Sequence, residues 1–179
     1  MFALPYNCGV GVQKFISGIE SPARRDVASH WNDARRHKQM PTWTDLSLPI
    51  LHPHFSLLWG FHYDRETGSL TGRLAGKHIK EWLGANFWGA KLEDIHPPHV
   101  VKGARAFLGP VVTAPSVGKC AGRLFTMGDE TITGERIALP LALNGINADG
   151  ILGASDFVYP ANATGAVVLI HENMEWCVL

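Results

Sequence analysis

The sequence has no excess of charge of either sign, and this absence argues against two classes of partner. Its 16 basic residues balance its 16 acidic ones. Proteins that bind nucleic acids or anionic membranes carry a basic excess that attracts phosphate groups, so we expect neither partner. The sequence also lacks any apolar run near the roughly 20 residues of a membrane-spanning helix. Its start has no basic region followed by a long apolar run, which a secretory signal needs.

Cysteine is scarce as well, with only Cys8, Cys120 and Cys177 in the chain. An odd number of widely separated cysteines fits neither a disulfide framework nor a metal site. This usage is typical of a reduced intracellular protein, and we expect a cytoplasmic location. The composition is 46% hydrophobic and 18% charged, which indicates a folded chain, and 179 residues suit one domain.

Motifs that carry catalysis are missing too. The glycines of residues 9–11 and 72–76 are too sparse for a phosphate-binding loop, and neither group lies between a strand and a long helix. No serine has the surroundings of a nucleophile elbow, and no cysteine lies in the helical box that flavin photochemistry requires. We therefore predict that the protein is not an enzyme and has no catalytic residues.

The N-terminal part of the sequence predicts an arm followed by a helix. Residues 1–20 contain one proline and several glycines and are interpreted as an irregular arm. Ser21 and Pro22 suit the start of a helix, and apolar residues recur at helical spacing after them. The prediction is therefore a helix over residues 21–38. The proline-rich residues 39–54 are interpreted as a segment that crosses the domain.

The rest of the sequence alternates strand and helix patterns. Two apolar runs that flank a turn predict a hairpin over residues 55–63 and 70–75. Helices are predicted over residues 77–83 and 98–107, the second ended by Gly109 and Pro110. Three further strands, separated by turn residues, are predicted over residues 118–127, 135–143 and 150–159.

These elements predict an α+β fold. Five strands can close into one antiparallel sheet, with helices packed on one face and the N-terminal helix outside it. We expect the domain to span residues 21–160 and residues 161–179 to form a C-terminal tail or an edge strand. Pro140 cannot donate to a sheet ladder, so it should mark an edge, a bulge or a position whose backbone nitrogen points outward.

Several short motifs occur along the chain in an order that is similar to that of a known protein family. They are Trp31, Pro41, Asp45, residues 72–76 (GRLAG), residues 134–141 (GERIALPL), Asn144-Gly145 and residues 151–153 (ILG). Over about residues 27–158 the sequence resembles a family of single-domain PAS-like proteins common in alphaproteobacteria. The resemblance implies a PAS-like fold. It also implies a sensory or protein-interaction role in bacterial signalling, exercised through partner proteins.

Aromatic residues flank the space that such a sheet and its helices would enclose. A small-molecule cavity is therefore an alternative to an ordinary packed core. The predicted ligand-binding residues are Arg73, His78, Trp82, Trp59 and Arg105. Arg73 is the strongest of them, because an inward arginine among apolar neighbours needs an anion, either a ligand carboxylate or Glu135. The alternative is that Arg73 lies on the outward face of its strand.

The nine histidines leave a second hypothesis open. His52 with His54, and His96 with His99, form two pairs that could contribute metal ligands, and His78 or His99 could hold haem. The alternative function is a small histidine-dependent metal-binding enzyme or a haem-binding sensor. Prolines flank both pairs and no metal motif is complete, so no metal ligand is predicted. Haem and a small organic ligand are the candidate cofactors.

The predicted protein partners are a second copy of the chain and a signalling protein. The helix over residues 21–38 lies outside the sheet-forming part of the sequence, so it is a candidate for dimer contacts. Replacing Trp31 by Asp is expected to weaken a homodimer.

Overall fold

The computed structural model describes residues 8–83, 86–158, 167–170 and 172–179. The helices are α1 (Cys8–Ser17), α2 (Pro22–Arg35), α3 (Leu48–Leu51), α4 (Lys77–Leu83), α5 (Leu92–Ile95) and α6 (Pro98–Thr113). Two 3-10 helices are η1 (Trp43–Asp45) and η2 (His52–Leu57). The strands are β1 (Leu58–Asp64), β2 (Ser69–Ala75), β3 (Ser116–Met127), β4 (Glu130–Leu141), β5 (Gly150–Val158), β6 (Val167–Leu169) and β7 (Glu175–Val178).

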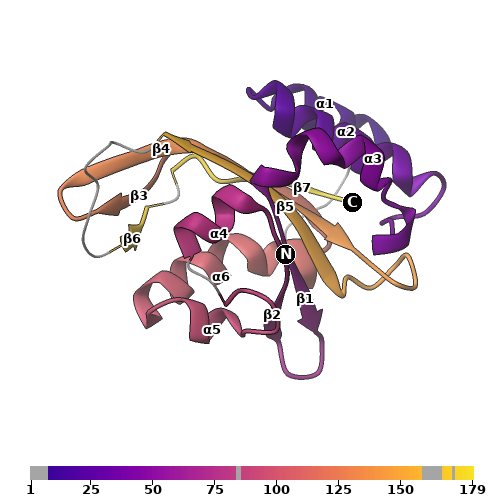
Figure 1. Cartoon of the computed structure of the whole chain (residues 1–179). Coiled ribbons are helices and arrows are strands. Elements are labelled where there is room, and N and C mark those ends of the chain that lie inside the picture. Colours follow the sequence, from indigo (N-terminus) through magenta and orange to yellow (C-terminus); the bar gives the residue numbers. More distant parts are fainter. Residues whose placement is uncertain (1–7, 84–85, 159–166, 171) are drawn as a thin grey trace, which may run out of the picture.

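The strands form one antiparallel sheet in the order β2-β1-β5-β4-β3, which ends in β6 and β7 (Figure 1). Both of these last strands pair with β3, β6 along residues 125–127 and β7 along residues 116–119. The predicted α+β fold with five antiparallel strands is confirmed. Both β6 and β7 lie within residues 161–179, for which a C-terminal tail or an edge strand was expected.

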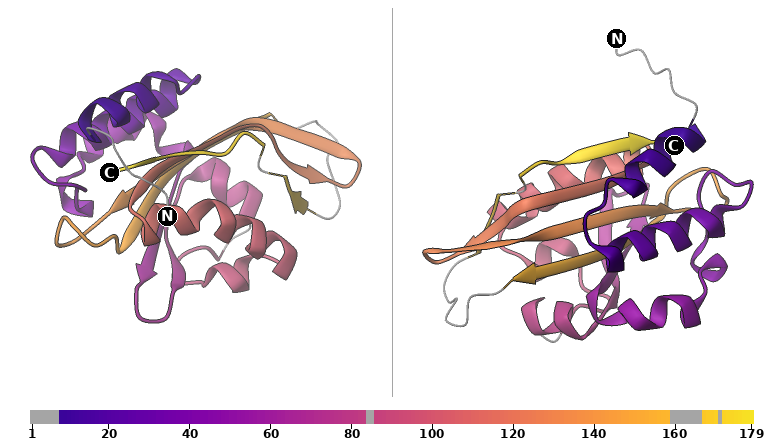
Figure 2. Two further views of the ribbon diagram at one scale, coloured as in Figure 1. Left: turned by 180° about the vertical axis from the view of Figure 1, so that it is seen from behind. Right: turned by 90° about the horizontal axis from the view of Figure 1, so that it is seen from above.

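Helices cover both faces of the sheet, as two views at right angles show (Figure 2). The face toward α4, α5 and α6 is called the inner face, and the face toward α1, α2 and α3 the outer face. The predicted helices on one face are α4, α5 and α6, and the predicted N-terminal helix, α2, covers the other face. Residues 135–141 of β4 are buried throughout, because a strand covered on both faces loses the usual alternation of buried and exposed residues.

Helix α2 packs on the outer face through Trp31, whose side chain has no exposed surface. Its Nε1 donates a 2.8 Å hydrogen bond to the carbonyl oxygen of Pro140. The pairing of β4 with β3 ends at Ala138, so Pro140 lies where β4 has only β5 as a neighbour, as expected for a proline in a strand. Trp31 therefore belongs to the protein core, and the expectation that it forms a dimer contact was wrong.

The same face of β4 anchors the start of α2 through Glu135. This buried carboxylate accepts hydrogen bonds from the backbone N–H groups of Glu20 and Ser21 and from Nε of Arg24, at 2.8–3.1 Å. The first N–H groups of a helix have no partner within the helix and attract negative charge. Glu135 thus fixes the N-terminus of α2 to the centre of the sheet.

Two helices differ from the sequence prediction because tertiary packing outweighs local preference. The expected arm contains α1, where Val12 and Ile16 are buried one turn apart. Helix α6 continues past Pro110 to Thr113, although a proline inside a helix costs about 3 kcal/mol. The extension buries Val111 and Val112, and each such burial contributes roughly 1.5–3 kcal/mol. None of the described helices combines the length and apolarity needed to cross a membrane.

Candidate ligand-binding cavity

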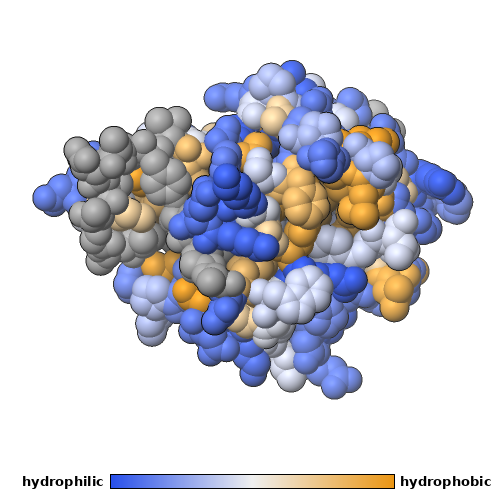
Figure 3. Space-filling view, viewed as in Figure 1, coloured by the Kyte–Doolittle hydropathy of each residue, from blue (hydrophilic) through white to orange (hydrophobic). Residues whose placement is uncertain are grey.

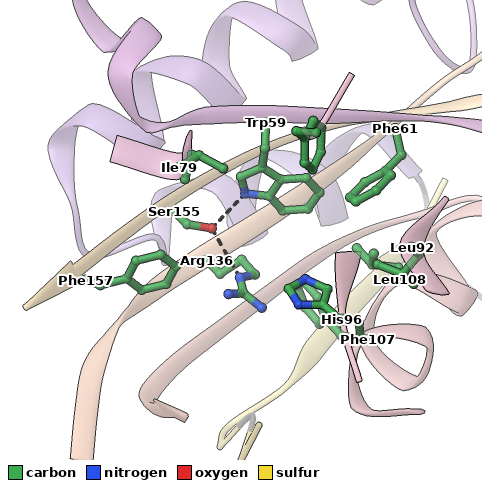
Figure 4. Close-up of a pocket in the computed structure, with 12 residues that line it drawn as sticks. Trp59, Phe61, Ile79, Leu92, His96, Phe107, Leu108, Arg136, Ser155 and Phe157 are labelled. Carbon is green, nitrogen blue, oxygen red and sulfur yellow. Dashed lines mark hydrogen bonds between the residues drawn. The ribbon is translucent and has the colours of Figure 1, made fainter. Parts of the chain in front are cut away.

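A cavity of about 50 Å³ lies between the inner face of the sheet and helices α4, α5 and α6 (Figure 4). We call it the inner cavity. Its wall is mostly apolar and aromatic, with three polar side chains among the lining residues. The lining residues are Trp59, Phe61, Ile79, Phe87, Leu92, His96, Ala104, Phe107, Leu108, Arg136, Ser155 and Phe157.

Strand β1 supplies one wall of the inner cavity through its alternating sequence. Side chains of a strand point to opposite faces in turn. Trp59 and Phe61 therefore line the inner cavity, and their rings meet edge to face with centroids 5.9 Å apart. Gly60 and His62, which lie between and after them, belong to the outer face.

Ser155 on β5 is the centre of the polar part of the cavity. Its hydroxyl oxygen accepts a 2.7 Å hydrogen bond from Nε1 of Trp59 and a 3.2 Å hydrogen bond from Nε of Arg136 (Figure 4). Both partners can only donate. The hydrogen of the Ser155 hydroxyl is therefore not used in either of these two bonds and can be donated to a further acceptor.

Arg136 lies across from Ser155 in the β4–β5 pair and is only 8% exposed. Its guanidinium carbon is 5.4 Å from the centroid of the Phe157 ring, an arrangement in which the ring face stabilises the cation. His96 lies beside it at the end of α5 (Figure 4). Burial and, to a lesser degree, the charge of Arg136 lower the pKa of His96 to about 4. The imidazole is therefore neutral near pH 7.

Cys120 is buried in β3 and is held as a thiol. Burial, together with the nearby charge of Glu172 and against that of Arg136, raises the pKa of Cys120 to about 11. Its Sγ donates to the carbonyl oxygen of Glu172 at 3.1 Å. Because the thiolate is the nucleophilic form of cysteine, this residue is not poised for covalent chemistry.

Of the four predicted ligand residues whose side chains the structure describes, one lines the inner cavity. Trp59 lines it, whereas Arg73, His78 and Arg105 are exposed and lie outside its wall. Arg105 pairs with Glu93 on the surface. Trp82 is in α4, but its side chain lies outside the described part of the structure. Whether any of the five binds a ligand stays a prediction.

Sequence reasoning missed Arg136 and Ser155 as polar residues of the cavity, and it considered His96 only as a candidate metal ligand. A signal for Arg136 was present, because Glu135 and Arg136 are two consecutive charges at the start of an otherwise apolar strand (IALPL). Charged residues are almost never buried without partners. Nothing in the sequence indicated that Glu135 pairs with Arg24 rather than with Arg73.

The histidines that suggested a metal site are dispersed. Among the described residues, no three side chains of His, Cys, Asp or Glu are grouped so that they could share a metal ion. His54 lies 3.4 Å from the carboxylate of Asp26. His78 and His99 are exposed and are not among the residues that line the inner cavity.

The antiparallel sheet, the helices on its inner face and the cavity between them form a small α+β domain. A family model described as PAS domain matches residues 19–155. The chain belongs to the PAS domain family, and it is thus a PAS-like sensory or interaction domain. Neither the curated proteins nor the solved structures contain a match to the chain.

Proposed function

We propose that this PAS domain is a sensor in bacterial signalling that binds a small carboxylate-bearing molecule in the inner cavity and acts through a partner protein. The observation that carries the proposal is the polar group formed by Arg136 and Ser155 inside an apolar wall. Small-molecule sites are mostly apolar and have a few placed polar groups that orient the ligand.

The chemistry of the two residues favours an anionic hydrogen-bond acceptor. The guanidinium of Arg136 presents N–H groups in a planar fork that matches a carboxylate. The hydroxyl hydrogen of Ser155 adds one more donor beside it. Around them, Phe61, Ile79 and Phe107 would contact the apolar body of the same molecule.

The size of the inner cavity limits what can enter without movement. About 50 Å³ exceeds the roughly 10–15 Å³ that one buried water needs, but is far below the roughly 300 Å³ of common ligand pockets. Helices α4 and α5, with seven and four residues, cover the cavity. Short elements with few hydrogen bonds open at low free-energy cost. We therefore infer that ligand binding displaces α4 and α5 and so changes the surface that a partner reads.

The proposal is tested by ligand binding to wild-type protein and to cavity variants. Native mass spectrometry after gentle purification reports a molecule that is already bound. A thermal-shift assay then tests whether added straight-chain or aromatic monocarboxylates bind. The variants are Arg136→Met, which keeps the apolar stem, and Ser155→Ala. Arg105→Gln is the control, because it removes an exposed arginine outside the cavity. We expect roughly tenfold or greater loss of affinity for R136M and S155A, in line with charge-assisted hydrogen bonds.

Circular dichroism of each variant separates loss of binding from loss of folding. If R136M does not fold, S155A carries the test, since it removes one hydroxyl and leaves the charge in place. Absence of any bound mass and of any carboxylate-induced shift in the wild type would overturn the ligand proposal. It would leave the domain as an interaction module with a closed core.

A further inference from the structure

A second pocket of about 200 Å³ lies on the outer face of the sheet, away from the inner cavity. We call it the outer pocket. Its lining residues come from η1 and its flanks, from β1 and β2, and from the β4–β5 connection. They are Thr42, Trp43, Thr44, His62, Arg73, Leu143 and Asp149. Figure 3 shows exposed apolar surface on the side of the molecule where α3 and the β4–β5 connection lie. Leu143, which belongs to this connection, is 81% exposed.

Trp43 of η1 packs against the sheet and forms the base of the outer pocket. A Cβ atom at Gly60 would lie 2.5 Å from the Trp43 ring, and a Cβ at Gly150 would lie 2.9 Å from its Nε1. Real Cβ atoms do not approach other atoms this closely. Two glycines on the adjacent strands β1 and β5 therefore leave the space in which the indole rests against the backbone.

Arg73 is placed over Trp43 by an irregularity of the sheet. In the β1–β2 pair, Gly60 faces Leu74 and Phe61 faces Gly72, so Arg73 is the extra residue of a β-bulge. Bulges redirect a side chain and often occur next to binding sites. The guanidinium carbon lies 4.9 Å from the centroid of the Trp43 ring. A guanidinium placed over an aromatic ring can keep N–H groups available for hydrogen bonds to a further partner.

The outer pocket holds two opposite charges that do not pair with each other. In the described part of the chain, no carboxylate lies within ion-pair distance of Arg73. Asp149 lines the same pocket, and its Oδ2 accepts a 2.9 Å hydrogen bond from the backbone N–H of Leu143. Its Oδ1 has capacity to accept a further donor. A ligand that carries both charges would satisfy both groups at once.

We propose that the outer pocket binds a small zwitterion of the α-amino acid class. The carboxylate of the ligand pairs with the N–H edge of Arg73, and its ammonium group pairs with Asp149. Its side chain lies on Trp43 and Leu143, which supply apolar surface. The volume of about 200 Å³ is comparable to that of a larger α-amino acid. This site is separate from the inner cavity, so it does not depend on the function proposed there.

The test is isothermal titration of the full chain with the proteinogenic α-amino acids, preceded by a thermal-shift screen of all of them. Phenylalanine is then compared with 3-phenylpropionate, which lacks the ammonium group, and with phenethylamine, which lacks the carboxylate. We expect at least about tenfold weaker binding of both analogues, because each loses one charge-assisted contact.

Arg73→Gln and Asp149→Asn identify the site. The amide oxygen introduced by D149N can still accept from the Leu143 N–H, so this variant removes the charge and keeps the local hydrogen bond. Each variant is expected to lose roughly tenfold or more in affinity. Arg105→Gln and Asp129→Asn are matched controls on exposed residues elsewhere and should bind as the wild type does.

Three outcomes would overturn the proposal. The first is that no amino acid binds the wild type at millimolar concentration. The second is that 3-phenylpropionate binds as well as phenylalanine, which would make the pocket a plain anion site. The third is that R73Q and D149N bind normally. Loss of amino-acid binding in Arg136→Met instead would assign the ligand to the inner cavity.

Discussion

Glu135 and Arg136 are consecutive residues of β4 whose charged side chains lie on opposite faces of the sheet. Glu135 holds the N-terminus of α2 and Arg24 on the outer face. Arg136 hydrogen-bonds Ser155 on the inner face, at the cavity. Because a strand directs neighbouring side chains to opposite sides, one dipeptide connects the polar part of the inner cavity to the first helices of the chain.

The Glu135 contact should be one of the largest single polar contributions to stability. Replacing Glu135 by Gln leaves Arg24 buried without its nearest charge partner, and breaking a buried pair costs roughly 3–5 kcal/mol. We expect the free energy of unfolding in urea to fall by about that amount. Glu93→Gln is the matched control, because its pair with Arg105 is exposed and worth about 0–1 kcal/mol. Equal losses in the two variants would contradict the assigned role.

Stability should fall as the pH drops below neutral. The pKa of His96 is lowered from 6.5 to about 4, mainly by burial, so the unfolded chain binds more protons between these pH values. Stability from this group is thus complete above about pH 6.5 and is lost progressively toward pH 4, by on the order of 2–3 kcal/mol.

His30 acts in the same direction. Burial lowers its pKa, and its Nε2 accepts a 2.8 Å hydrogen bond from the Ser47 N–H, which only the neutral ring can do. Urea unfolding from pH 8 to pH 4 measures both effects. His96→Gln and His30→Gln should each flatten the profile, whereas His37→Gln, an exposed control, should not. A wild-type profile without slope in this range would refute the prediction.

A substitution that fills the inner cavity tests whether the domain is a ligand-binding sensor or an interaction module with a packed core. Ala104 on α6 lines the cavity and is 8% exposed. Ala104→Val should change the free energy of unfolding by less than about 1.5 kcal/mol, because the added methyl groups enter existing space. It should also abolish the thermal shift caused by carboxylates. Ala23→Val on α2 is the control, because it lowers helix preference by the same substitution but lies outside the cavity. Retained carboxylate binding in A104V would place the ligand elsewhere.

A homodimer stays a prediction, and the structure changes how it should be tested. Trp31→Asp would place a charge in the core and is expected to unfold the domain. Ile50 on α3 is 55% exposed and lies near the exposed Leu48, so Ile50→Asp tests a contact at the surface. We expect I50D to keep its circular dichroism spectrum and to lower the dimer fraction in light scattering after gel filtration. A wild type that is monomeric at every concentration would refute the dimer.

Much of the fold could be predicted from local patterns. The hairpin of β1 and β2, the helices α2 and α4 and the three later strands follow from apolar periodicity and turn residues. The predicted strand over residues 55–63 was wrong at residues 55–57, which belong to η2. The predictions also failed at α1 and at the end of α6. There, buried contacts with distant parts of the chain outweigh the tendency of glycine and proline to interrupt a helix. Such contacts cannot be predicted from the local sequence.

The sequence by itself determined the PAS-like order of elements and the pair of aromatic residues Trp59 and Phe61 that alternate with Gly60 and His62. Only the tertiary structure decided which charges meet. It pairs Glu135 with Arg24, directs Arg136 into the inner cavity and moves Arg73 to the outer face through a bulge. The physical reason is that charge partners are fixed by strand register and by the packing of helices far apart in the chain, whereas element order depends on neighbours along it.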